Sequence, residues 1–130
     1  MGTEHRGCDR CWPDIAEAAW DARSHLKRLE FIVDDTHLIV SLLACEACGQ
    51  KFLSIMTETI DWVDGDDPQH WVSIPVTPDE ASKLVAAGEK RLHQVLSDID
   101  HDRRSLHRDA PKGSVATSYW ASGISIAWHD

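Results

Sequence analysis

Two cysteine pairs are the residues of this sequence whose types and spacing best suit chemistry. Cys8 and Cys11 form one CxxC pair, and Cys45 and Cys48 form a second. A CxxC turn directs two thiolates toward one point, so two such turns supply four soft ligands for a tetrahedral ion, with Zn–S distances of about 2.3 Å. We therefore predict one structural zinc ion, because four protein ligands leave no open position for water or substrate.

Other uses of the same cysteines stay open at this point. Iron in a rubredoxin-like site takes the same four thiolates, and ligand type alone does not separate the two metals. Disulfides would suit a secreted chain, but the polar segment from Met1 to Arg10 lacks the apolar stretch of a secretory signal, so we expect a cytoplasmic protein. A thiol redox sensor or enzyme is a third function class, although neither pair lies in a visible βαβ pattern.

The second cysteine pair lies in the segment LLACEACGQKF, where two strand-like runs flank a tight turn. Together with the first pair, this knuckle resembles a zinc ribbon over residues 8 to 11 and 36 to 60. The chain departs from that pattern in the 33-residue gap between the pairs and in Trp12–Pro13, which follows the first pair where glycine is frequent. The resemblance implies, as one possible function, an adaptor or regulator that docks onto a transcription or translation assembly.

The helices and strands expected around the cysteines indicate an α+β fold, in a single domain over residues 1 to 130. We expect an antiparallel sheet of four to five strands with two main helices. The helices are predicted over residues 13 to 30 and 78 to 106, and the strands over residues 36 to 44, 51 to 62, 70 to 76, 115 to 120 and 124 to 128. Thr77, Pro78 and Glu80 form a capping-box signature at the start of the second helix. Gly88 interrupts the apolar stripe of that helix and predicts close packing there.

An acidic turn between two tryptophans is the candidate partner-binding segment. Trp62 and Trp71 flank the turn, and Asp64, Asp66 and Asp67 lie within it. Carboxylates can contact Lys or Arg clusters while aromatic rings provide contact area. A hydrated turn whose tryptophans point into the core explains the same residues equally well. The carboxylate spacing does not match an EF-hand loop.

The charge balance narrows the class of partner. A net charge of −9 favours a basic protein partner, and no basic stripe suited to nucleic-acid phosphate is evident. The sequence has no apolar run of about 18 residues, so it predicts no membrane-spanning helix. No HExxH, GxSxG, P-loop or GxGxxG pattern occurs, and His107 lies among charged residues expected on a solvated helix face, so we expect no enzyme activity.

In size and charge the chain resembles bacterial immunity proteins, which neutralise toxic nucleases by direct binding. That resemblance implies a basic toxin domain as the partner and contact through the acidic turn. The sequence therefore favours a non-catalytic, zinc-stabilised binding protein of this kind over the ribbon-type adaptor and the thiol enzyme.

Overall fold

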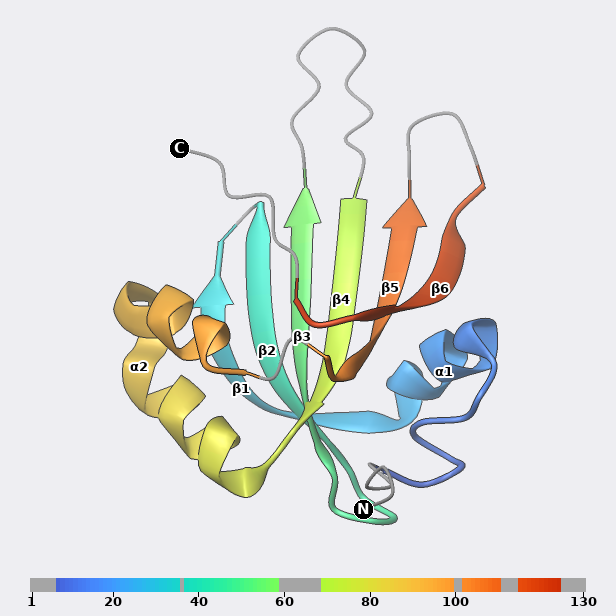
Figure 1. Ribbon diagram of the computed structural model, residues 1–130, viewed down its shortest axis with the longest axis horizontal. Coiled ribbons are helices and arrows are strands. Elements are labelled where there is room, and N and C mark those ends of the chain that lie inside the picture. The colour runs from blue at the N-terminus through green and yellow to red at the C-terminus, as the bar shows by residue number, and fades with distance from the viewer. Residues whose placement is uncertain (1–6, 36, 59–68, 100–101, 111–114, 125–130) are drawn as a thin grey trace, which may run out of the picture.

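The computed structural model describes residues 7–35, 37–58, 69–99, 102–110 and 115–124. Within these residues one antiparallel sheet of six strands follows chain order from β1 to β6 (Figure 1). The strands are β1 Leu26–Asp34, β2 Leu38–Cys45, β3 Lys51–Glu58, β4 Gln69–Val76, β5 Arg104–Ala110 and β6 Thr117–Ser122. Helix α1 (Ala16–Ala22) and the 3-10 turn η1 (Arg23–His25) precede β1, and helix α2 (Pro78–Ser97) lies between β4 and β5. The predicted α+β class is confirmed, with six strands rather than four to five.

The two faces of the sheet carry separate apolar clusters. On β2, Val40 and Leu42 pack into a large cluster that includes Leu84 and Leu92 of α2. Leu43 of the same strand packs into a smaller cluster with residues of α1 and of the segment before it. Because side chains alternate across a strand, the two clusters lie on opposite faces, which we name the α2 face and the α1 face. Figure 1 shows α2 beside β1 at one end of the sheet and α1 beside β6 at the other.

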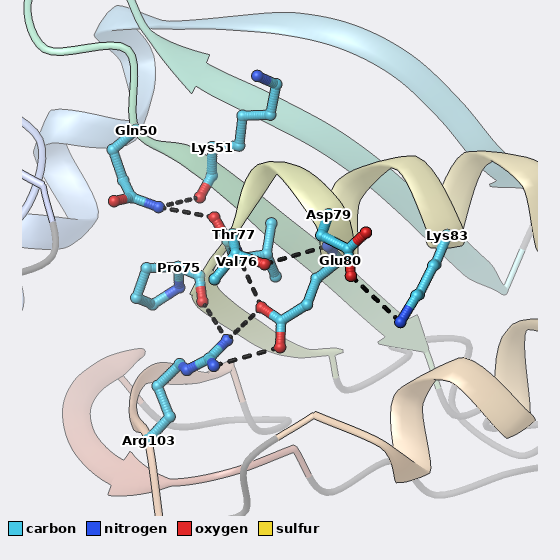
Figure 2. Close-up of polar contacts among 9 residues, drawn as sticks. All are labelled: Gln50, Lys51, Pro75, Val76, Thr77, Asp79, Glu80, Lys83 and Arg103. Atoms are coloured by element: carbon cyan, nitrogen blue, oxygen red, sulfur yellow. Dashed lines mark hydrogen bonds and ion pairs between the residues drawn. The ribbon is translucent and has the colours of Figure 1, made fainter.

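The capping box predicted at the start of α2 is confirmed (Figure 2). The Thr77 hydroxyl accepts from the Glu80 amide at 3.1 Å, and the Glu80 carboxylate accepts from the Thr77 amide at 2.9 Å. Arg103, in the segment before β5, donates to both carboxylate oxygens of Glu80 at 2.7 and 3.2 Å and to the Pro75 carbonyl at 3.0 Å. These bonds connect the chain after α2 to the end of β4 and to the first turn of the helix.

Both predicted helices are too long. The helix expected over residues 13 to 30 ends at Ala22, and the chain enters β1 at Leu26 after the 3-10 turn. The pairing of β1 with β2 shifts register twice, which breaks the alternation that marks a strand in a sequence. The helix expected over residues 78 to 106 ends at Ser97, and Leu106 lies on β5 opposite Ser73.

Gly88 also differs from expectation, and the predicted terminal hairpin is only partly described. A Cβ atom at Gly88 would meet nothing within 4 Å, so close packing is the wrong explanation. The residue has φ 60° and ψ −161°, a conformation that kinks α2 and that glycine adopts without steric cost. Residues Thr117–Ser122 form β6, which pairs with β5, and the second strand predicted over residues 124 to 128 lies outside the described residues from residue 125 onward. Among the helices of the described residues, none has the length and apolar character needed to cross a bilayer.

Candidate metal centre

The four cysteines meet beside the turn between β2 and β3. Cys45 ends β2 and Cys48 lies in the turn, whereas Cys8 and Cys11 lie in the segment before α1. All four sulfurs lie within 4.8 Å of one another, and none is in a disulfide. The Sγ–Sγ distances are 3.7 Å from Cys8 to Cys11, 3.9 Å from Cys8 to Cys45 and 3.7 Å from Cys11 to Cys48. A tetrahedral ion with Zn–S bonds of about 2.3 Å requires sulfurs about 3.8 Å apart, so the four cysteines are positioned to bind one metal ion.

Backbone hydrogen bonds shape each cysteine turn. The amides of Cys11 and Trp12 donate to the Cys8 carbonyl at 3.1 and 2.8 Å, and the Gly49 amide donates to the Cys45 carbonyl at 2.8 Å. The Cys8 amide also donates to the Cys11 sulfur at 3.2 Å. Amides that face a sulfur favour its thiolate form, which is the form that binds metal.

A glycine precedes the first cysteine pair and is needed there for two reasons. Gly7 has a φ of 82°, in the left-handed region that side chains disfavour. A Cβ atom at this position would also lie 2.9 Å from the Cys11 sulfur. Gly49 has a similar φ of 80°, but a Cβ atom there would meet nothing within 4 Å. Our sequence reasoning missed Gly7, although a glycine directly before the CxxC pair was the available signal.

The thiols of the site differ in acidity. Hydrogen bonds from the backbone amides of Cys11 and Arg10 lower the pKa of the Cys8 thiol to about 7. Burial raises the pKa of the Cys11 and Cys48 thiols. A metal ion must therefore displace protons from these two thiols, so metal affinity should fall as pH falls.

The segment that carries the first cysteine pair is held to the sheet by aromatic contacts as well. The Trp12 ring lies 5.1 Å from the ring of Phe52 on β3 and 4.9 Å from that of Trp120 on β6. The Trp120 indole donates to the Asp14 carbonyl at 2.7 Å. The four-cysteine cluster and Trp12 thus place the same segment against the α1 face at two points.

Known proteins do not add to this description. No family model, curated protein or solved structure matches the chain. The assignment of the metal centre therefore depends on the positions of the four sulfurs and on the chemistry of thiolate ligands.

The predicted partner-binding residues are only partly described. Trp62, Asp64, Asp66 and Asp67 lie outside the described residues. Trp71 lies on β4 and is partly buried, and its ring contacts the Trp20 ring edge-on at a centroid distance of 5.4 Å. Its ring therefore forms part of the α1 face.

A second polar group, which was not predicted from the sequence, lies on β4 and β5. His70 contacts both Asp109 and His107, with 3.2 Å between the two imidazoles, and His107 contacts the Ser105 hydroxyl at 2.8 Å. The serine is fully buried and His107 is 4% exposed, so the expectation of a solvated helix face is wrong for His107. Burial lowers the pKa of His107, and the nearby His70 lowers it further.

Proposed function

We propose that the chain binds one zinc ion at Cys8, Cys11, Cys45 and Cys48 and that this ion is structural. The observation that carries the proposal is the mutual approach of four sulfurs from two separate segments to tetrahedral spacing. Four thiolates complete the coordination of zinc and leave no position for a reacting water. The ion connects the segment before α1 to the β2–β3 turn, which are far apart in the sequence.

Metal analysis of the purified protein tests this proposal. We expect one zinc per chain, and Cys45→Ser or Cys48→Ser should lower both the metal content and the melting temperature, because each removes one of four ligands. Cobalt substitution should give the intense visible bands of tetrahedral thiolate coordination. Iron in the purified protein would replace zinc in the proposal, and unchanged zinc content in both serine variants would contradict the site itself.

We further propose that this scaffold is non-catalytic and binds a basic protein, as an acidic immunity protein does. A net charge of −9 favours association with a positively charged partner and speeds the encounter. The serine–histidine–aspartate group described above does not argue for an enzyme, because the Ser105 hydroxyl is fully buried and out of reach of a substrate. The partner class that fits is a nuclease-type toxin domain, with Asp64, Asp66 and Asp67 as the proposed contacts.

Binding measurements at several salt concentrations test the partner proposal. A single basic partner bound one-to-one, with affinity that falls as salt rises, would support it. Exchange of the three aspartates for lysine should weaken binding and reduce its salt dependence, whereas the same exchange at Asp79, an exposed residue on α2, is the control. Unaltered affinity after the triple exchange would exclude this surface, and recovery with a ribosome or polymerase would favour the adaptor instead.

A further inference from the structure

The α1 face contains a cavity that the metal centre does not use. It has a volume of about 750 Å³ and lies between the α1–η1 segment, the start of β1 and the strands β2 to β4. Aromatic and apolar side chains line it together with hydroxyl groups, including Trp20, Trp71, Met56, Ser41 and Ser54. Pockets for small molecules commonly measure about 300 to 1,000 Å³ and combine apolar walls with a few polar groups, so this cavity has suitable size and composition.

Arg23 is the polar group that distinguishes this cavity. Its guanidinium lies over the Trp20 ring at 4.4 Å and the Trp71 ring at 5.1 Å, and it donates one hydrogen bond, at 2.7 Å, to the Ser54 hydroxyl. Its Nε atom is buried without a hydrogen-bond partner. Burial lowers the pKa of Arg23 to about 10, and the positive charge of Arg28 contributes. Arg23 is partly buried, and its guanidinium has five N–H donors, so a single bond to a neutral hydroxyl among the described residues leaves most of its capacity unused.

Arg103, which is also partly buried, shows how this chain pairs such an arginine. Arg103 also has an unpartnered Nε, yet its terminal nitrogens hold both carboxylate oxygens of Glu80 (Figure 2). Among the described residues, no carboxylate forms an ion pair with Arg23. A buried charge is normally paired, and no described residue supplies a carboxylate for Arg23, so its guanidinium can accept an anionic ligand as counter-ion.

The charged side chains described around the cavity are mostly positive. Arg23 and Arg28 both line it, with His25 beside them, and Asp21 is the one acidic residue among the described residues of the lining. Asp21 is exposed and forms no ion pair with Arg23. The described lining therefore has a local excess of positive charge within a chain of net charge −9, which favours an anionic ligand.

We propose that this cavity binds a small organic anion, with a carboxylate or phosphate group against Arg23 and a flat apolar body against Trp71 and Met56. Arginine forms paired hydrogen bonds with both kinds of anion, and these bonds are stronger than those between neutral groups. The proposal does not depend on the metal or on a protein partner.

Titration of the full chain with benzoate and with phenyl phosphate tests the proposal, with benzyl alcohol as the uncharged analogue. Trp20 and Trp71 line the cavity, so tryptophan fluorescence should change and saturate with at least one anion, at roughly millimolar concentration or below for so small a ligand. The more tightly bound anion identifies the preferred acidic group. Absence of saturation with both anions, or equal binding of benzyl alcohol, would overturn the proposal.

A matched pair of variants locates the site. Arg23→Met keeps an unbranched side chain without the charge, and should weaken anion binding by about tenfold or more. Arg108→Met is the control, since Arg108 also lies over the Trp20 ring, at 4.6 Å, but pairs with Glu17 and does not line the cavity. It should change binding by less than about twofold, because the ligand does not meet it. Equal losses in the two variants would place the anion elsewhere.

The wild-type chain gives an independent readout if Arg23→Met fails to fold. The Arg23 Nε–H is buried, so its proton resonance should be observable and should shift when the anion binds. An Arg23 Nε–H resonance that stays unchanged at saturating anion would contradict the proposed contact.

Discussion

Gly7 and Gly49 allow the backbone and steric demands of the metal centre to be separated at single residues. Both have a positive φ, of 82° and 80°, so alanine should strain the backbone to a similar extent at either position. Only Gly7→Ala also places a methyl group 2.9 Å from the Cys11 sulfur. We expect both variants to lower the melting temperature and Gly7→Ala to weaken metal binding more, by about tenfold or more in competition with a chelator.

Equal metal affinity in the two alanine variants would show that the contact at Gly7 is relieved by a small shift of the cysteine turn. The comparison is informative because the two glycines lie beside different cysteine pairs of the same site. A loss of stability without a loss of metal affinity would likewise separate the fold from the metal centre.

His107 should make the stability of the chain depend on pH. Burial lowers the pKa of this imidazole below its usual 6.5, since the charged form is poorly solvated, and His70 adds to the effect. Above about pH 6.5 the imidazole is neutral in the folded and unfolded states and its contribution to stability is fully present. Below that pH the unfolded chain takes up the proton first, so the free energy of unfolding falls until the pKa of the folded state is reached.

Urea unfolding between about pH 5.5 and pH 7.5 measures this effect in the wild type and in His107→Asn. Metal release in acid also lowers stability as pH falls, but it should do so equally in both proteins. The slope of stability against pH should therefore be smaller in the variant. The same slope in both would show that protonation of His107 is not coupled to unfolding.

At the scale of elements, the ion pair between Arg103 and Glu80 should determine how firmly α2 is held to the sheet. Both side chains are largely buried, with exposed fractions of 8% and 20%, and each carboxylate oxygen accepts a bond from the guanidinium. Arg103→Met removes these donors and leaves the Glu80 carboxylate partly buried without its partner. We expect a loss of roughly 3 kcal/mol in the free energy of unfolding, measured by urea denaturation.

The control is Lys83→Met, which breaks the exposed i,i+4 pair with Asp79 on the same helix and should change stability little.

The pH dependence of stability gives a second check on the Arg103–Glu80 pair. Burial would raise the pKa of Glu80, but bonds from Arg103 and Thr77 outweigh it, and the net pKa lies below the usual 4.5. The stabilisation is therefore present above about pH 4.5 and is lost as pH falls through the lower pKa of the folded state. A loss in Arg103→Met that stays constant through this acid range would contradict the assignment.

Some elements could be predicted from the sequence because one local signal determined them. The strands β2 and β3 are apolar runs on either side of a cysteine turn, and the start of α2 carries a capping box. The strand β1 could not be predicted, because most of its side chains are exposed and two register shifts disturb its alternation. The strand β5 was missed because its buried positions include Ser105 and His107, whose side chains contact each other, and His107 also contacts His70 on β4.

At the scale of the whole molecule, the candidate sites differ in how far the sequence could reveal them. The metal centre was predictable because each CxxC motif shows both the type and the spacing of two ligands. The fold had only to bring the two motifs together. The cavity around Arg23 was not, because its walls come from α1, η1 and the strands β1 to β4, and no sequence motif marks its lining as a group. Arg23 itself lies in the segment predicted as a helix over residues 13 to 30, where the structure has the 3-10 turn η1.

Removal of the metal should loosen one face of the molecule without unfolding the whole. The cluster on the α2 face joins α2 to the inner strands and contains no cysteine, whereas the cluster on the α1 face contains Cys11 and Cys45 beside Trp12. A chain of 130 residues can bury a core without metal, unlike a short zinc finger. We therefore expect the chelated protein to keep its far-ultraviolet circular dichroism while it loses the near-ultraviolet signal of its tryptophans.

The melting temperature of the chelated protein should fall by about 10 °C, which corresponds to a few kcal/mol for a domain of this size, and should recover when zinc is restored. Hydrogen exchange distinguishes the two faces directly. Amides of β6, whose Trp120 contacts Trp12, should exchange faster without metal, whereas amides at the centre of β3 should remain protected. Loss of protection throughout the sheet would mean that the metal stabilises both faces together, because the segment before α1 would then be required for the entire fold.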